Sequence, residues 1–176
     1  MRQLGQLTIA VLIALSPVAA KAADPITVPT SGNDALPVAD AGFNWDGFYA
    51  GVYGVGRSSP VDGGQFGLGV DLGANARLEF VLVGGEVALE GLSGSTSTVY
   101  GEAIGKTGIM LSDNLVLYGA AGIGSDFSAQ SDVLFGGGLD IAVSDSVSVD
   151  ARYLHGVPIA GANPKDQVTI GAKFHF

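Results

Sequence analysis

DQVTIGAKFHF, residues 166–176, alternates strictly between two kinds of side chain. The apolar positions are Val168, Ile170, Ala172, Phe174 and Phe176, and the positions between them are Thr169, Gly171, Lys173 and His175. Successive side chains of an extended strand point to opposite faces, so a period of two separates these two sets. The stretch therefore predicts a β-strand with one apolar face and one polar face.

Further stretches of similar length precede this strand. The candidate strands are residues 47–57, 64–74, 78–90, 98–111, 114–124, 131–143, 146–155 and 166–176. A tilted strand needs roughly 9–11 residues to cross a bilayer, and an even number of strands lets the first and the last pair antiparallel. The connections alternate between longer ones (57–64, 91–97, 124–131, 156–166) and tight turns (74–77, 111–114, 143–146). We therefore expect an all-β fold, a closed antiparallel eight-stranded transmembrane β-barrel.

The two faces of the candidate strands differ in chemistry. One parity collects Phe66, Leu68, Val70, Leu72, Val81, Val83, Val87, Leu89, Val133, Phe135, Leu139, Ile141, Val147, Val149, Tyr153, Val168, Ile170, Phe174 and Phe176, and we expect it to face lipid. The other parity collects the charges Asp71, Glu86, Glu90, Glu102, Lys106, Asp140, Asp150, Arg152 and Lys173, together with His175. The strands at 47–57 and 114–124 are too rich in Gly and Ala for a face to be assigned.

The beginning of the chain has the pattern of an export signal. Arg2 precedes an apolar run at residues 7–18, and Ala20-Lys21-Ala22 fits a cleavage site with small residues at its first and third positions. The run is too short to span about 30 Å of hydrocarbon. We predict a signal peptide at 1–22, a flexible periplasmic lead-in at 23–44, which is rich in Pro and Ala, and a barrel at 45–176.

Composition excludes several kinds of function. Removal of Arg2 and Lys21 with the signal leaves 6 basic and 17 acidic residues, a net charge of −11. Nucleic acid is an unfavourable partner for such a chain, because its phosphates need neutralising Lys and Arg. Cysteine is absent, which rules out disulfides and thiolate metal sites. We predict no cofactor and no metal.

The segment Trp45-Asp46-Gly47-Phe48-Tyr49-Ala50-Gly51 resembles the opening of the first strand in small porin-like surface proteins of alphaproteobacteria. The closing strand, which ends in Phe, resembles the last strand of bacterial outer-membrane barrels. The chain is thus similar to the porin-like and opacity-protein-like surface antigens with an OmpA/OmpX-like barrel. This resemblance implies a place in the outer membrane, contact with its lipid and lipopolysaccharide, and recognition of Phe174 and Phe176 by the barrel-assembly machinery.

The interior charges allow two interpretations. An eight-stranded barrel is just wide enough for its own side chains to fill it, so the charges can form a polar plug. The six acids and three bases also leave a negative excess that would favour cations if water entered. We expect a structural role in the envelope, with a narrow cation-preferring, porin-like passage as the alternative.

Catalysis and solubility are the remaining alternatives. A serine hydrolase needs Ser, His and an acid held together, and neither His155 nor His175 has such a neighbourhood in the sequence. We therefore do not expect an enzyme such as a barrel lipid hydrolase. A soluble periplasmic β-sandwich is disfavoured by the apolar parity. The connections expected at the cell surface are short and rich in Ser and Gly, which gives little support for a specific extracellular ligand.

Overall fold

The computed structural model describes residues 42–94, 97–127 and 130–176. The predicted signal peptide at 1–22 lies outside these ranges, and so does the predicted lead-in except for residues 42–44. No helix in the described ranges is long and apolar enough to span a bilayer.

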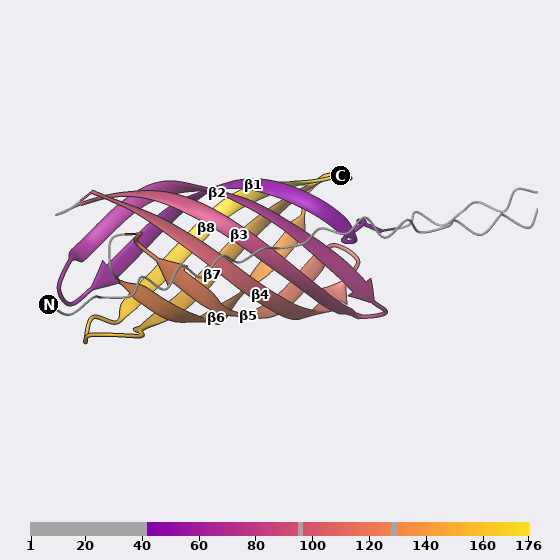
Figure 1. Ribbon diagram of the computed structural model, residues 1–176. Coiled ribbons are helices and arrows are strands. Elements are labelled where there is room, and N and C mark those ends of the chain that lie inside the picture. Colours follow the sequence, from indigo (N-terminus) through magenta and orange to yellow (C-terminus); the bar gives the residue numbers. More distant parts are fainter. Residues whose placement is uncertain (1–41, 95–96, 128–129) are drawn as a thin grey trace, which may run out of the picture. The chain divides into compact units, whose positions relative to one another are not determined.

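Eight strands form in chain order. They are β1 (Gly47–Ser59), β2 (Gly63–Leu78), β3 (Val81–Gly94), β4 (Thr98–Ser112), β5 (Leu115–Ser125), β6 (Ser131–Ala142), β7 (Val147–Pro158) and β8 (Lys165–His175). Each pairs antiparallel with the next, and β8 pairs antiparallel with β1 from Tyr49↔His175 to Ser58↔Asp166, which closes the barrel (Figure 1). Closure leaves no strand with a free edge. The predicted fold class is confirmed.

The two ends of the barrel carry different connections. One end, here called the turn end, has the turns at 79–80, 113–114 and 143–146 together with residues 42–46 and Phe176. The other, the loop end, has the connections from β1 to β2, β3 to β4, β5 to β6 and β7 to β8. The predicted division into long and short connections is wrong for the first one, because β1 and β2 stay paired as far as Ser59↔Gly63. The connection between β1 and β2 is therefore residues 60–62, which is shorter than the turn at 143–146.

The turn between β2 and β3 lies further along the chain than the sequence predicted. We expected it at 74–77, but β2 continues to Leu78, which pairs with Val81 across a two-residue turn. Asn75 is buried inside the barrel, so the inward and outward alternation runs on through the predicted turn. In the new turn Glu79 has a φ of 58°, a left-handed conformation that favours glycine.

Replacing Glu79 with glycine is therefore expected to raise the free energy of unfolding by about 1 kcal/mol, because the left-handed strain disappears. Urea midpoints of the refolded protein measure the effect. Glu79→Ala is the control, since it removes the charge but keeps the Cβ. A stabilisation of similar size in Glu79→Ala would assign the effect to charge rather than to backbone strain.

The outer wall of the barrel is apolar along its whole circumference. The predicted outward face is confirmed for β2, β3, β6, β7 and β8, with Val81 and Val147 partly buried and the other members of that parity exposed. The two unassigned strands follow the same rule: β1 turns Val52 outward and β5 turns Leu117 and Ile123 outward. We call this surface the apolar belt.

The inner wall carries apolar clusters as well as charged groups. One apolar cluster, which begins at the turn end with Phe43 and Trp45, also contains Leu82, Ile104, Val116, Tyr118, Ala120, Leu134 and Leu154. Four tyrosines also point inward, and Tyr49 lies so close to Gly73 on β2 that a Cβ there would overlap its ring. Glycine at this position gives the ring its space in the narrow lumen.

Candidate functional site: the charged interior of the barrel

The structure places the ionisable residues that the sequence assigned to the interior on the inner face of the barrel. They are buried, and they are Asp71 on β2, Glu86 and Glu90 on β3, Glu102 and Lys106 on β4, Asp140 on β6, Asp150 and Arg152 on β7, and Lys173 on β8. A buried charge is costly unless opposite charges and hydrogen bonds surround it. The contacts of these residues form two clusters, which Arg152 connects.

Lys173 is the centre of the cluster nearer the turn end. Its Nζ lies 3.3 Å from Asp150 Oδ1, 3.4 Å from Glu86 Oε2 and 3.7 Å from Asp140 Oδ2. These carboxylates come from three different strands, so one ammonium group holds β3, β6 and β7 against β8. Lys106 is also buried here, but its only ion pair among the described residues is with Glu86 at 3.9 Å.

Arg152 joins this cluster to the second one. Its Nη1 lies 2.5 Å from Glu86 Oε1, and its Nη2 lies 3.6 Å from Glu102 Oε2. The guanidinium group therefore reaches from β7 across the lumen to β3 and β4. An ion pair of this kind fixes the distance between opposite walls of the barrel.

The second cluster, nearer the loop end, contains two residues that the sequence reasoning missed, Arg57 and Gln167. Arg57 Nη2 lies 2.8 Å from Glu90 Oε2 and 3.7 Å from Glu102 Oε1. The amide of Gln167 donates to Glu90 Oε1 at 2.7 Å and to Glu102 Oε1 at 2.8 Å. The guanidinium of Arg57 also lies 3.8 Å from the ring centre of Tyr100, a favourable cation–π distance.

A further interior pair, Lys165 and Asp132, was also missed. Lys165 Nζ lies 2.9 Å from Asp132 Oδ2, which also accepts a 2.8 Å hydrogen bond from Tyr100. The parity of β6 was the available signal for Asp132, since it alternates with the outward Val133. With Arg57, Lys165 and Asp132 added, the interior holds seven carboxylates and five bases. The acid excess falls from three to two.

Tyrosine hydroxyl groups donate hydrogen bonds to several of the buried carboxylates. Tyr49 donates to Glu86 Oε2 at 2.7 Å, and Tyr53 donates to Glu90 Oε1 at 3.1 Å. Tyr118 donates to Asp150 Oδ2. Other buried atoms have no hydrogen-bond partner in the described part of the protein, among them Asp71 Oδ1, both side-chain polar atoms of Asn75, Asp140 Oδ1 and Thr169 Oγ1. Buried polar groups of this kind are normally satisfied by ordered water.

The turn end of the lumen is closed by aromatic rings. Trp45 is fully buried and donates its indole N–H to the carbonyl of Asp113 at 2.9 Å. Phe43, from the predicted lead-in, packs against Trp45 with ring centres 4.5 Å apart and against His175 at 4.8 Å. We call this group of Phe43, Trp45 and His175 the Trp45 stopper. Gly47, with a φ of 112°, turns the chain from Trp45 into β1. Within the predicted lead-in, Phe43 thus packs against the barrel, while Gly42 and Asn44 are exposed.

The loop end is tied together by hydrogen bonds between two connections. Asn163 donates from Nδ2 to Asp62 Oδ2 at 2.9 Å and accepts from the backbone N–H of Val61 at 3.2 Å. Ser59 bonds to Asp62 at 3.0 Å. These contacts hold the β1–β2 and β7–β8 connections side by side.

Both histidines have polar partners, but neither forms a triad. Asp166 Oδ1 lies 2.8 Å from His155 Nδ1 and accepts a 2.6 Å bond from Tyr153. Ser148 Oγ lies 3.0 Å from His175 Nε2. In the described residues no serine contacts His155 and no carboxylate contacts His175, so the order serine–histidine–acid is not assembled. The described residues also hold no cluster of three or more His, Asp or Glu side chains suited to a metal.

The two terminal aromatics lie on the outer wall at the turn end. Phe174 and Phe176 are exposed, and their ring centres are 5.7 Å apart. The backbone N–H of Phe176 donates to the carbonyl of Phe48 at 3.0 Å, which extends the pairing of β8 with β1. Their rings are therefore accessible from outside the barrel.

Comparison with known proteins gives a likeness of fold. No family model and no curated protein matches the chain. The crystal structure of Ail, the attachment invasion locus protein of Yersinia pestis, matches with a TM-score of 0.57 and 16% identity over 74% of this chain and 99% of Ail. The chain has the eight-stranded barrel fold of Ail.

Two further solved structures agree with this assignment. Ail in complex with the heparin analogue sucrose octasulfate gives a TM-score of 0.55 and 15% identity over 74% of this chain and 99% of that one. Neisserial surface protein A gives a TM-score of 0.52 and 15% identity over 73% of this chain and 97% of its own. At such identities the shared property is the fold.

Proposed function

We propose that the chain is an integral outer-membrane β-barrel that stabilises the envelope and presents short loops at the cell surface. The observation that carries the proposal is the apolar belt around a closed sheet whose lumen buries charged side chains such as Glu86, Arg152 and Lys173. A water-soluble β-protein would bury such a surface, whereas a bilayer covers it. The fold shared with Ail is consistent with this place.

The predicted signal peptide and the two ends of the barrel suggest how the protein reaches the membrane and how it is oriented there. A cleaved signal peptide at 1–22 would export the protein, and the turn end would remain in the periplasm. The barrel-assembly machinery, outer-membrane lipid and lipopolysaccharide are the partners that this route implies. The connections at 60–62, 95–97, 126–130 and 159–164 would then face the outside.

Fractionation and gel mobility test the proposal together. In detergent extracts of outer membranes, the unheated protein is expected to migrate faster than the boiled protein, because a closed barrel resists unfolding by the detergent. A single band at one position, with release of the protein by osmotic shock, would place it in the periplasm and contradict the proposal.

The charge of the surface supports a structural role over recognition of a polyanion. The mature chain has six basic residues, and five of them, Arg57, Lys106, Arg152, Lys165 and Lys173, are buried in the lumen. Arg77 at the turn end remains, and its Nε lies 3.8 Å from Asp46. A sulfated ligand such as the one bound to Ail needs exposed cations. We therefore expect no binding of heparin analogues to this chain.

A narrow cation-preferring passage is the second candidate. The acid excess of the lumen and its unpartnered polar atoms favour it. The ion pairs across the lumen and the Trp45 stopper oppose it. In planar bilayers we expect the protein to give no conductance steps, and cation-selective steps from the wild-type protein would favour the passage instead.

Truncation of the terminal aromatic tests the assembly route. Phe176→Ala is expected to lower the amount of folded barrel in the outer membrane several-fold, because the exposed ring is the proposed assembly signal. Quantifying the heat-modifiable band against total protein measures this. Phe66→Ala, which removes an exposed ring of the outer wall on β2 but keeps both terminal aromatics, is the matched control. Normal levels of Phe176→Ala would contradict the signal.

A further inference from the structure

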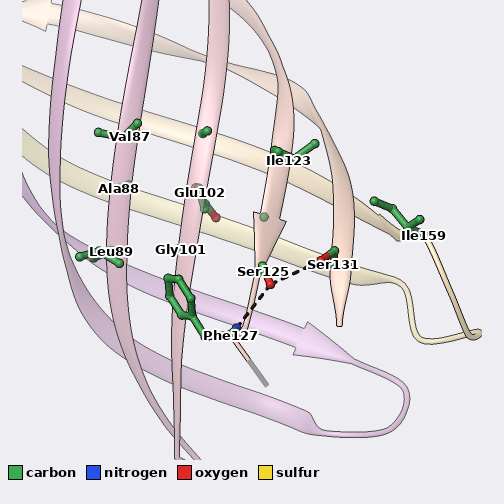
Figure 2. A pocket seen from close by; sticks show the side chains of 12 residues that line it. Val87, Ala88, Leu89, Gly101, Glu102, Ile123, Ser125, Phe127, Ser131 and Ile159 are labelled. Atoms are coloured by element: carbon green, nitrogen blue, oxygen red, sulfur yellow. Dashed lines mark hydrogen bonds between the residues drawn. The ribbon is translucent and has the colours of Figure 1, made fainter. Parts of the chain in front are cut away.

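Hollows outside and inside the barrel differ in what lines them. On the outer wall, a groove of about 530 Å³ has the exposed side chains of Val87, Leu89 and Ile123 among its walls, so it continues the apolar belt (Figure 2). Inside the barrel, buried polar atoms gather near the turn end. Cavities among apolar side chains stay dry, whereas buried polar groups without protein partners are satisfied by water. The interior near the turn end is therefore the part of the barrel that needs water.

A chain of contacts leads from the Trp45 stopper to the guanidinium group that crosses the lumen. The ring centres of His175 and Tyr49 are 5.4 Å apart, and the Tyr49 ring centre lies 4.4 Å from Lys106 Nζ. Lys106 Nζ lies 3.9 Å from Glu86 Oε2, and Glu86 Oε1 lies 2.5 Å from Arg152 Nη1. We call the interior between the stopper and Arg152 the turn-end chamber.

Asn75 brings two unpartnered polar atoms into this chamber. Neither its Oδ1 nor its Nδ2 has a hydrogen-bond partner in the described ranges, although the residue is buried. It lies opposite Gly47, where β1 begins. A Cβ built on Gly84 would be 2.3 Å from Asn75 Oδ1 and 3.1 Å from Lys106 Cε, so the amide and the lysine meet over this glycine.

Two carboxylates of the chamber also have an unpartnered oxygen. Oδ1 of Asp71 and Oδ1 of Asp140 are buried and accept no hydrogen bond within the described part of the chain. Asp71 lies over Gly51, which is opposite Lys173, and Asp140 Oδ2 lies 3.7 Å from Lys173 Nζ. Both carboxylates thus border the same ammonium group, and water is the partner that their free oxygens need.

The segment that covers the chamber is not part of the sheet. Residues 42–46 precede β1 and belong to no strand, and side chains tie them to the barrel. The indole of Trp45 donates to the carbonyl of Asp113 at 2.9 Å, and the carboxylate of Asp46 accepts the backbone N–H of Arg77. The ion pair between Asp46 and Arg77 is 3.8 Å long and nearly half exposed, so it contributes little. Such a segment can open locally while the sheet stays paired.

The opposite side of the chamber is closed more firmly. Arg152 is buried and pairs with Glu86 and Glu102, and Arg57 adds a 2.8 Å ion pair to Glu90 beyond it. Breaking buried pairs on one side is strongly destabilising. The two closures of the chamber therefore differ, since one consists of a few side-chain contacts at a chain segment and the other of buried charges on the strands.

We propose that residues 42–46 act as a latch on a water-filled chamber with a single opening. Release of the latch admits water and small cations from the turn end as far as Arg152 and no further. The chamber prefers cations because its acids outnumber its bases. Its ionisable residues are the bases Lys106 and Lys173 and the acids Asp71, Glu86, Asp140 and Asp150. The latch adds a one-sided opening to the proposed envelope role and requires only the closed barrel.

Cysteine accessibility in detergent micelles tests the latch, because the chain has no cysteine of its own. Asn75→Cys places a thiol in the chamber and removes none of the hydrogen bonds that the described residues form. Val55→Cys places a buried thiol in the apolar cluster that Val55 forms with Leu92 and Tyr100 nearer the loop end. The probe is the cationic methanethiosulfonate MTSET, which converts a thiolate into a mixed disulfide and releases methanesulfinate.

Trp45→Ala removes the ring of the latch and its bond to Asp113. In the Asn75→Cys background we expect it to raise the labelling rate at least tenfold, while the Val55→Cys thiol reacts as slowly as in the latched protein. Phe48→Ala, which removes an exposed ring from the outer wall of β1, is the matched control and should leave both rates unchanged.

Asp46→Ala provides a second test that leaves the side chains of the lumen in place. It removes the acceptor of the Arg77 N–H together with the ion pair, so we expect a smaller rise in the labelling rate of the Asn75→Cys thiol. Asp46→Asn keeps an acceptor oxygen and should stay close to the latched protein.

The rates are measured on the heat-modifiable band, so unfolded protein is not counted. Fast labelling of the Asn75→Cys thiol with the latch intact would overturn the latch, and so would slow labelling after both Trp45→Ala and Asp46→Ala. Fast labelling of the Val55→Cys thiol in the Trp45→Ala variant would reveal a continuous passage and overturn the single opening. Fractionation of cells decides the membrane position separately, because these rates depend only on the closed barrel.

Discussion

Replacing Lys173 with methionine is expected to destabilise the barrel by about 3–5 kcal/mol, the cost of breaking a buried ion pair on one side. The substitution keeps the length of the side chain but leaves the carboxylates of Glu86, Asp140 and Asp150 without the ammonium that lies 3.3 to 3.7 Å from them. Like charges would then face one another in a narrow lumen. Urea titration of the heat-modifiable band in phospholipid vesicles measures the loss.

Lys106→Met is the matched control for this prediction. Lys106 is buried like Lys173, but its ion pair with Glu86 is longer, at 3.9 Å. Glu86 keeps Arg152 and Lys173 as partners when Lys106 is lost. We expect the control to cost less than half as much as Lys173→Met, and equal losses would mean that the lumen does not depend on Lys173 as its centre.

Placing arginine at Val70 is expected to cost about 2–4 kcal/mol, because this position lies at the middle of β2 on the apolar belt, near the midplane of the proposed bilayer. The side chain of Val70 is 54% exposed on the outer wall. An arginine there can neither reach the headgroups without distortion nor pair with a carboxylate on its own face. Folding yield and urea midpoint in vesicles of fixed composition are the measurements.

Leu78→Arg on the same strand and the same face provides the comparison. Leu78 ends β2 at the turn end, where a charge reaches water and costs about 0–1 kcal/mol. A large difference between the two arginine variants is expected. Equal tolerance of both would mean that the belt is not covered by lipid.

Alternation made most of the fold predictable from the sequence. In β2, Phe66, Leu68, Val70 and Leu72 mark the outward face. An even number of strand-length stretches, most of them with such a period, favours a closed sheet. The turn after β2 was misplaced because Ala74 and Asn75 have little strand preference of their own. Their place in the strand depends on pairing with β1 and β3, which is tertiary information.

The side chains that face the lumen could be predicted only in strands where apolar and polar residues alternate clearly. Arg57 was missed because glycines obscure the face of β1, and Lys165 because the last strand was expected to begin one residue later. The Trp45 stopper was missed for a different reason. Its position depends on the carbonyl of Asp113, which lies in a distant turn, and no local pattern indicates such a contact.

The order of the strands along the chain determines when each interior charge can meet its ion-pair partner during folding. Glu86, Glu90 and Glu102 lie on β3 and β4, but their partners Arg57, Arg152 and Lys173 come from β1, β7 and β8. In the proposed membrane, a β3–β4 hairpin that entered the hydrocarbon early would carry these three carboxylates with one base, Lys106, which pairs with Glu86. We therefore expect a chain without β7 and β8 to insert poorly in the proposed membrane, because Arg152 and Lys173 would be missing from the lumen.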